Sequence, residues 1–445
     1  MSPGNYRPVS LTSIVCKVME SIIKDNIVTH LARNHLIHAS QHGFMSSLSC
    51  QTNLLEYLDV LTRLIDAGQA VDVLYLDFAK AFDKVPHQRL LQKLRAHGIT
   101  DKVNTWIECW LSGRQQRVVL NGKSSEWAPV TSGVPQGSVL GPTCFIIFIN
   151  DIDEVVDIVN GFIFKFADDT KYGRTVISES DRELMQKDID NLLKWAETWQ
   201  MEFNGKKCKM VHFGRQNPRY TYTMGGYAPG GIVLDAVEVE KDIGVLIHES
   251  LKPSQQCRKA ASKANQVLGQ MGKSFHYRDR HTWLHLYKTF VRHHLEFSCQ
   301  AWSPWLKSDI NVLEKVQERA VNKVRGLRSN TYEDKLKELN LLSLFDRRKR
   351  GDLIQIWKTI HGHSRMNPAM FQTASTNPRY TRCTNKKFNL AKPFGRLEVR
   401  ANFFSVRAVD GWNKLPEVVQ NAVTLDDFKR GYDKFVHNII WNDHH

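Results

Sequence analysis

Two strongly apolar segments of the chain end in aspartate, and this pattern limits the possible folds more than any other feature. The run VDVLYLDFAKAFD (71–83) carries Asp77, and FIFKFADDT (162–170) carries Asp168 and Asp169. A carboxylate at the tip of a buried strand is costly unless a cation shares it. If the two tips meet, their oxygens suit divalent metal ions. Paired ions of this kind support nucleotidyl transfer.

The positive charge of the chain is concentrated in its second half. Residues 1–250 hold 26 Lys and Arg against 29 Asp and Glu, a net charge of −3, whereas 251–445 hold 35 against 17, a net charge of +18. A length of 445 residues indicates two or three domains. We therefore expect a catalytic domain followed by a basic extension that binds a polyanion. A solvated, Lys-rich helical surface is the alternative interpretation.

The remaining composition is typical of an intracellular globular protein. MSPGNYRPVS lacks the apolar core of a secretory signal, and no apolar run approaches the ~20 residues of a membrane span. The eight cysteines are scattered without a CxxC pair, which predicts reduced thiols. His281 and His285 stand four residues apart without further ligands nearby, so a metal site there is not expected.

Hydrophobic spacing predicts the order of the elements. We expect helices at 15–31, 52–65, 86–97, 101–112 and 182–200, strands at 71–78, 206–214 and 241–248, and further helices after Pro253. Asn121-Gly122 predicts a tight hairpin, and the turn-rich segment SGVPQGSVLGP (132–142) predicts a loop that leads into a helix. Asp168-Asp169 falls where a second hairpin should turn. The stretch 363–397 reads as a basic, turn-rich connection.

The order of these parts resembles a reverse transcriptase, in particular the non-LTR retrotransposon enzymes of the jockey and chicken-repeat-one type. The blocks that carry the resemblance are NYRPVSL (5–11), QHGF (41–44), YLDFAKAFDKVPH (75–87), LSGRQQRVVLNG (111–122), SGVPQGSVLGP (132–142), FADDT (166–170), FNGKKCKM (203–210) and KDIGVLI (241–247). Later segments, FVRHHLEF (290–297), ERAVNKVRGL (318–327) and FFSVRAVDGWNKLP (403–416), are also similar to that group.

This resemblance implies an α+β fold of the right-hand polymerase type, with an antiparallel palm sheet backed by helices. Residues 1–70 would form partial helical fingers, 71–250 the palm, 251–362 a basic helical thumb-like region, and 363–445 a helical C-terminal region of unknown role. The activity implied is RNA-directed DNA polymerisation, with dNTPs, an RNA template and a DNA primer as partners. Nucleus or cytoplasm is the location expected for the family.

The resemblance also implies roles for individual residues. Asp77, Asp168 and Asp169 would hold two Mg²⁺ ions, for which Mn²⁺ can substitute. The nucleotide-binding set would comprise Phe78, Phe82, Gln136, Gly137, Lys207 and Arg7. Phe82 would exclude a 2′-hydroxyl, although its spacing alone equally fits a core aromatic. Lys207 equally fits a plain surface lysine, and Asp83 is expected to be a turn residue that bonds its own backbone.

The sequence departs from the family pattern in two places. MSSLSC (45–50) stands where the family usually carries basic residues, and the chain opens almost directly on NYRPVSL. We therefore expect a 5′-truncated copy, with any nicking supplied by an endonuclease acting in trans. A catalytically inactive or domesticated nucleic-acid-binding remnant is the main alternative. A metal-dependent nuclease is disfavoured, because it would not need the loop at 132–142.

Overall fold

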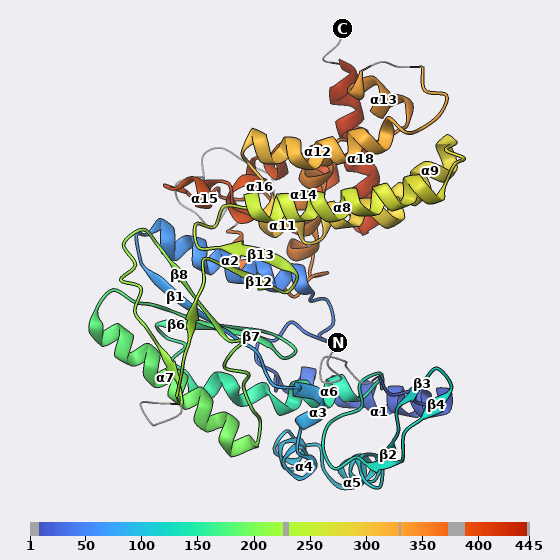
Figure 1. Ribbon diagram of the computed structural model, residues 1–445. Coiled ribbons are helices and arrows are strands. Elements are labelled where there is room, and N and C mark those ends of the chain that lie inside the picture. The colour runs from blue at the N-terminus through green and yellow to red at the C-terminus, as the bar shows by residue number, and fades with distance from the viewer. Residues whose placement is uncertain (1–8, 226–230, 329–330, 373–387, 443–445) are drawn as a thin grey trace. The chain divides into compact units, whose positions relative to one another are not determined.

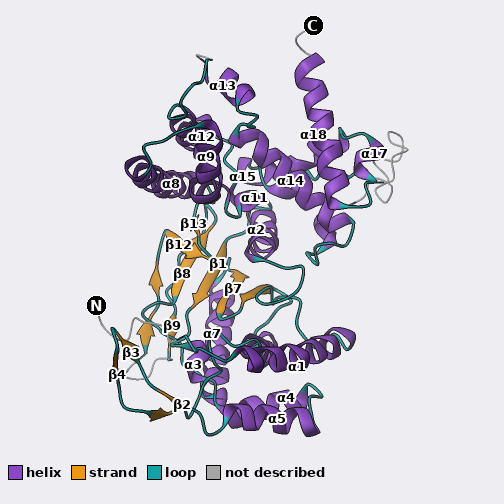
Figure 2. Cartoon of the chain, turned by 90° about the vertical axis from the view of Figure 1, so that its right-hand side faces the viewer, coloured by secondary structure: helices purple, strands orange, loops and turns teal. Residues whose placement is uncertain are grey.

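The computed structural model describes residues 9–225, 231–328, 331–372 and 388–442, and the chain forms two compact units (Figures 1 and 2). The first unit combines the chain up to residue 45 with 69–237, and the second combines 46–68 with 238–445. This division differs from the domain boundaries predicted from sequence, because 46–68 belongs with the C-terminal half rather than with the segment that precedes it.

A five-stranded sheet forms the centre of the first unit. Its strand order is β11-β8-β1-β7-β6, with antiparallel pairing except for the parallel β11–β8 edge. The strands are β1 (Val71–Leu76), β6 (Gly161–Phe166), β7 (Asp169–Thr175), β8 (Lys209–Phe213) and β11 (Asp235–Ala236). All six residues of β1 are buried, which fits its central place and its near-continuous apolar sequence.

Helices and short hairpins complete the first unit. Its helices are α1 (Ile14–Arg33), α3 (Ala81–Lys84), α4 (His87–Ala96), α5 (Asp101–Leu111), α6 (Gly141–Phe148), the 3-10 helix η2 (Asn150–Val155) and α7 (Glu179–Trp199). Its two-residue strands are β2 (Gln115–Gln116), β3 (Val119–Leu120), β4 (Lys123–Ser124), β5 (Ala128–Pro129), β9 (Thr223–Met224) and β10 (Ile232–Val233). The helices predicted at 15–31, 86–97, 101–112 and 182–200 are confirmed.

The core of this unit lies between the sheet and its helices. From α7, Met185, Ile189, Leu192 and Trp195 join the same buried cluster as Leu74 and other sheet residues. These α7 residues recur at helical spacing, so one face of the helix is apolar throughout. The amphipathic stripe predicted for this segment therefore packs on the sheet as expected.

Turn geometry confirms one predicted hairpin and corrects a predicted strand. Asn121 and Gly122 both have positive φ, +48° and +78°, and join β3 to β4, as the type I′ preference requires. Residues 241–248, predicted as one strand, instead form the antiparallel pair β12 (Val239–Asp242) and β13 (Val245–His248). The turn between them is Ile243-Gly244, where φ is +43° and +92°, so the apolar run is broken at its glycine.

The second unit is helical apart from the β12–β13 pair within the described ranges. Its helices are α2 (Cys50–Asp66), α8 (Ser254–Ser274), α9 (Arg280–Leu286), the π-helical turn η3 (Tyr287–Val291), α10 (Arg292–Glu296), α11 (Cys299–Trp302), α12 (Lys307–Val321), α13 (Tyr332–Glu338), α14 (Leu344–Ile360), η4 (Pro368–Met370), α15 (Glu398–Ala401), α16 (Phe404–Asn413), α17 (Glu417–Gln420) and α18 (Leu425–Asn442). None of the described helices combines the length and apolar character that crossing a bilayer requires.

Buried polar contacts explain why α2 belongs to the second unit. Asp59 is almost fully buried, and its Oδ1 accepts hydrogen bonds from Arg400 Nη1 at 2.8 Å and Ser405 Oγ at 2.5 Å. Breaking a buried pair of this kind is strongly destabilising, because the remaining charge is left uncompensated. At the start of α2, Ser49 Oγ accepts from Thr52 N in a capping box. A serine of the MSSLSC segment therefore acts as a helix cap.

Candidate active site

The sheet register brings the predicted acidic positions to one edge. In the antiparallel β1–β7 pair, Leu76 lies opposite Thr170 and Tyr75 opposite Lys171. One step further along the same register, Asp77 follows β1 directly beside Asp169, the first residue of β7. Asp168 precedes it in the turn between β6 and β7. The two apolar strands therefore place all three carboxylate positions at the same end of the sheet, as the sequence pattern predicted.

The turn that carries Asp168 is tight and is held from outside the hairpin. Phe166 pairs with Asp169, which leaves Ala167 and Asp168 as the turn, and Ala167 adopts φ +58°. The backbone N–H of Ala167 donates to Gln41 Oε1 at 2.9 Å. The same oxygen accepts from Gly43 N at 2.7 Å. A single buried amide from the QHGF block thus links its own loop to the turn that carries Asp168.

Gly43 lets these two segments approach closely. A Cβ atom at this position would lie 2.2 Å from Ala167 N and 2.9 Å from the carbonyl carbon of Phe166. Both neighbours are backbone atoms, so a side chain at residue 43 would force the turn away. Gln41 and Gly43 were recognised only as part of a sequence block, and their contact with the turn is visible only in three dimensions.

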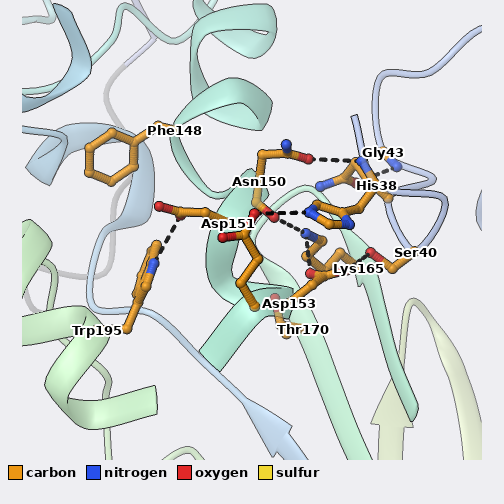
Figure 3. A network of polar contacts seen from close by, with 12 residues as sticks. His38, Ser40, Gly43, Phe148, Asn150, Asp151, Asp153, Lys165, Thr170 and Trp195 are labelled. Carbon is orange, nitrogen blue, oxygen red and sulfur yellow. Dashed lines mark hydrogen bonds and ion pairs between the residues drawn. The ribbon is translucent and has the colours of Figure 1, made fainter. Parts of the chain in front are cut away.

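A network of buried polar contacts connects β6 of the hairpin with η2 and with residues 38–40 (Figure 3). Lys165, fully buried on β6, forms an ion pair with Asp153, and its Nζ donates to the backbone oxygen of Asn150 at 3.0 Å. Ser40 Oγ also donates to Asp153. His38 N donates to Asn150 Oδ1 at 2.9 Å. Burial lowers the pKa of Lys165 from its ordinary value, and the adjacent Asp153 opposes that shift.

Asp77 has one carboxylate oxygen available for a cation. Its Oδ2 is buried and, among the described residues, accepts no hydrogen bond. The ammonium of Lys207 lies 3.6 Å from this oxygen. The Asp77 backbone is fixed, because its carbonyl accepts from Asn204 N at 2.7 Å. Oδ2 therefore has the Lys207 ammonium as its ion-pair partner, and a carboxylate oxygen of this kind is chemically suited to a hard divalent ion.

The donor set fits such an ion in type and in backbone position. Across the described ranges, however, no three Asp, Glu, His or Cys side chains are gathered into a metal-binding group. Asp77, Asp168 and Asp169 therefore share an edge of the sheet without forming an assembled three-ligand site. The side chain of Lys207 is exposed and lies beside Asp77.

Phe82 and Phe78 occupy different environments. The Phe82 ring is partly buried and stacks on Phe145, with centroids 4.5 Å apart and planes 15° apart, and Phe44 meets it edge-on at 6.2 Å. Phe78 is 6% exposed and packs against Phe203 at 4.5 Å between centroids. The side chain of Phe78 is thus a core group, whereas Phe82 lies at the boundary of the core.

The loop at 132–142 lies beside Phe82 and is fixed at several points. Val134 N donates to the Phe82 backbone oxygen at 2.8 Å, and Gln136 Nε2 donates to Asp83 Oδ1 at 3.3 Å. Gly137 has φ +99°, and a Cβ there would lie 2.8 Å from the Ser10 backbone oxygen. The glycine is therefore required both for its conformation and for the close approach of the segment before α1.

A cavity of about 300 Å³ lies beside this loop and α3. Its lining includes the cationic side chains of Lys80 and Arg114, together with Asp83 and Gln136. Arg114 Nη2 donates to the Gly133 backbone oxygen at 2.9 Å, and burial lowers the pKa of its guanidinium. Lys80 and Arg114 were not predicted as site residues, because isolated basic residues carry no distinctive sequence signal.

Glu20 of α1 holds the end of the same loop. It is fully buried, and its Oε2 accepts from Val139 N at 2.6 Å and Leu140 N at 3.0 Å. Its Oε1 accepts from Trp110 Nε1 at 3.3 Å. The carboxylate thereby positions the entry to α6. Arg7, the other predicted nucleotide contact near the start of the chain, lies outside the described residues.

The chain thus has a mostly antiparallel sheet with three aspartates at one end, beside a hairpin turn and a glycine-bearing loop. The chain belongs to the reverse transcriptase (RNA-dependent DNA polymerase) family, whose profile matches residues 2–269. This membership confirms the α+β, right-hand polymerase class and the reverse transcriptase resemblance expected from the sequence.

Relatives among mobile elements refine the family assignment. The chain is 25% identical over 335 residues to the RNA-directed DNA polymerase from mobile element jockey of Drosophila melanogaster, covering 72% of this chain and 36% of the relative. It is 24% identical over 363 residues to the probable RNA-directed DNA polymerase from transposon X-element of the same species, covering 77% and 38%. The chain thus spans little more than a third of the length of these relatives.

Among solved structures, apo telomerase from Candida tropicalis matches with a TM-score of 0.41 and 10% identity, covering 68% of this chain and 50% of that one. A similarity this distant adds nothing to the assignment.

Proposed function

We propose that this chain is an RNA-directed DNA polymerase of the non-LTR retrotransposon type, which extends a DNA primer on an RNA template with dNTPs. The observation that carries the proposal is the convergence of Asp77 with the Asp168-Asp169 hairpin at one edge of the sheet. Family membership over residues 2–269 supports it independently. Within this proposal, the sheet with α6 and α7 is the palm, and the basic helices of 251–362 form a thumb-like region.

Asp77, Asp168 and Asp169 are the residues that would hold Mg²⁺, or Mn²⁺ in its place. When bound, paired ions of this kind neutralise charge on the attacking and leaving oxygens of phosphoryl transfer. The Oδ2 of Asp77, which pairs with the exposed Lys207 ammonium and accepts no hydrogen bond among the described residues, supports this assignment. In the proposal, Gln41 and Gly43 keep the turn with Asp168 in position. Lys207 supplies a mobile positive charge beside the carboxylates, suited to a triphosphate.

The nucleotide would be selected beside Phe82. Its stacking on Phe145 restricts the ring to one orientation, and a rigid ring next to the sugar would clash with a 2′-hydroxyl. Gln136 and Gly137 would bring the loop backbone close to the nucleotide and template. Lys80 and Arg114 line the adjoining cavity, and their charges are suited to phosphate. Arg7 remains a proposed phosphate contact from sequence.

The proposal is tested by primer extension with variants of the acidic edge. Asp168→Ala and Asp77→Asn should each abolish extension of a DNA primer on an RNA template while leaving thermal unfolding close to that of the wild type. Asp25→Asn is the matched control, because Asp25 is exposed on α1 and its carboxylate pairs with its neighbour Lys24. Extension that persists in Asp168→Ala would refute the assignment.

The alternative, a nucleic-acid-binding remnant or domesticated protein, makes a different prediction for the same proteins. Wild type and Asp168→Ala would then bind an RNA–DNA hybrid equally and neither would extend it. A nuclease would instead shorten the labelled primer. Primer extension and hybrid binding together therefore distinguish a polymerase, a binding remnant and a nuclease.

A further inference from the structure

The second unit contains a cavity of about 530 Å³ bordered by α14, α16 and α18. Figure 1 shows these three helices packed together. The volume lies within the range of ~300–1,000 Å³ that is usual for small-molecule sites. The segment of residues 303–305, ahead of α12, closes one side.

Arg348, on the cavity wall, is a buried cation that lacks hydrogen-bond partners at Nε and Nη2 among the described residues. Its side chain belongs to a residue that is 3% exposed. It forms no ion pair with any residue that the structure describes. Burial therefore lowers its pKa, although the nearby Glu314 and Asp352 oppose the shift. Leaving a guanidinium in this state costs stability unless an anion compensates it.

Other groups on the cavity wall also offer hydrogen-bond donors or positive charge. Trp305 Nε1 is also buried without an acceptor. Asp352, an acid on the cavity wall, is already occupied by a two-point pair with Arg407, Nε–Oδ2 3.0 Å and Nη2–Oδ1 2.9 Å. Lys349 and Lys414 add two exposed ammonium groups. Among the described residues of this wall, the unpartnered buried atoms are thus all donors, which favours an anionic, acceptor-rich ligand.

The cavity also has an aromatic side. Phe345, Tyr432 and Phe435 line it together with Trp305. Burial raises the pKa of Tyr432 to about 12, so its hydroxyl stays protonated and can donate a hydrogen bond. Flat aromatic surfaces beside cations suit a base attached to a phosphate.

We propose that this cavity binds one nucleotide, with its phosphate on Arg348 and its base against the aromatic side chains. The nucleotide is either free or an unpaired residue of a nucleic-acid strand, because both present the same phosphate and base. This site is separate from the proposed catalytic edge, since all its lining residues belong to the second unit.

Binding by the full chain in EDTA tests the site without metal-dependent binding at the carboxylates. The probes are AMP, adenosine and a fluorescein-labelled oligo(dA) of about ten nucleotides. Arg348→Met is compared with Arg365→Met, which removes the same charge from an exposed arginine in the same unit. We expect Arg348→Met to weaken AMP or oligonucleotide binding about tenfold or more, and Arg365→Met to change it less than about twofold.

The pattern of losses identifies the source of the nucleotide. Weakened AMP binding with unchanged oligonucleotide binding indicates a free nucleotide, and weakened oligonucleotide binding indicates a strand. Adenosine, which lacks the phosphate, should not bind in either case. Equal effects of Arg348→Met and Arg365→Met on both probes would overturn the proposal.

Stability provides a second criterion. Because Arg348→Met removes a buried guanidinium whose Nε and Nη2 have no acceptor among the described residues, its ligand-free melting temperature should equal or exceed that of the wild type. A marked fall would show that the guanidinium is satisfied within the fold and would overturn the site. Trp305→Phe, which keeps the ring but removes the donor, should also weaken binding. It tests the cavity without altering charge.

Discussion

Replacing Gly43 by alanine should displace the turn that carries Asp168. The added Cβ would lie 2.2 Å from Ala167 N and 2.9 Å from the carbonyl carbon of Phe166. No side chain can rotate away, because both atoms belong to the backbone. The two segments must therefore separate by roughly 1 Å or more to reach ordinary contact distances.

The expected losses follow from this displacement. Overpacking of a well-packed site costs ~1–3 kcal/mol, and weakening of the two hydrogen bonds to Gln41 Oε1 adds ~0.5–1.5 kcal/mol each. We expect the free energy of unfolding to fall by about 2–6 kcal/mol in total. If Asp168 acts as proposed, a shift of this size should also slow primer extension about 100-fold.

Gly269→Ala is the matched control for this substitution. Gly269 lies in α8, and a Cβ there would meet nothing within 4 Å. Alanine should therefore stabilise the helix by ~1 kcal/mol and leave extension unchanged. Urea unfolding and single-turnover extension measure both quantities. A Gly43→Ala protein with the unfolding free energy and extension rate of the wild type would refute the close contact.

Three further changes probe the surroundings of the site. Glu20→Ala leaves the N–H groups of Val139 and Leu140 without their acceptor and should lower the unfolding free energy by ~2–4 kcal/mol in urea; a loss below ~0.5 kcal/mol would contradict the role of Glu20. Burial lowers the pKa of Lys93 to about 8 from 10.5, against the opposing charge of Asp151. Between these pH values the unfolded chain holds more protons than the folded one, so the free energy of unfolding should rise with pH by up to ~3 kcal/mol from this group. Lys93→Met should lack that rise. Identical pH profiles of wild type and Lys93→Met would contradict the lowered pKa of Lys93. Phe82→Val should increase ribonucleotide incorporation relative to deoxynucleotides in single-nucleotide extension, and an unchanged ratio would remove Phe82 from sugar selection.

The central strand and the hairpins were predictable because their signals are local. β1 is a nearly continuous apolar run, and Asn121-Gly122 specifies the turn of the β3–β4 hairpin by backbone conformation. The shared edge of Asp77 and Asp168-Asp169 followed from the ends of two apolar segments. By contrast, the split of 241–248 at Gly244 was missed, because its β-forming residues outweighed one turn glycine in the sequence pattern.

The remaining features depend on contacts between distant residues. α2 belongs to the C-terminal unit through Asp59 and Arg400, 341 positions apart, and no periodicity reports such a pair. Gln41 likewise meets Ala167 across 126 positions. Arg348 Nε and Nη2 have no acceptor among the described residues. Such a missing contact depends on the folded arrangement of distant residues, and no sequence pattern predicts it.

The most direct measurement of the central claim is extension of a labelled DNA primer annealed to an RNA template by the purified wild-type chain, with Mg²⁺ and dNTPs. Binding of the same hybrid is measured in parallel. We predict products that lengthen to the end of the template and disappear when the template is omitted. A chain that binds the hybrid and leaves the primer unextended with either Mg²⁺ or Mn²⁺ would contradict the account.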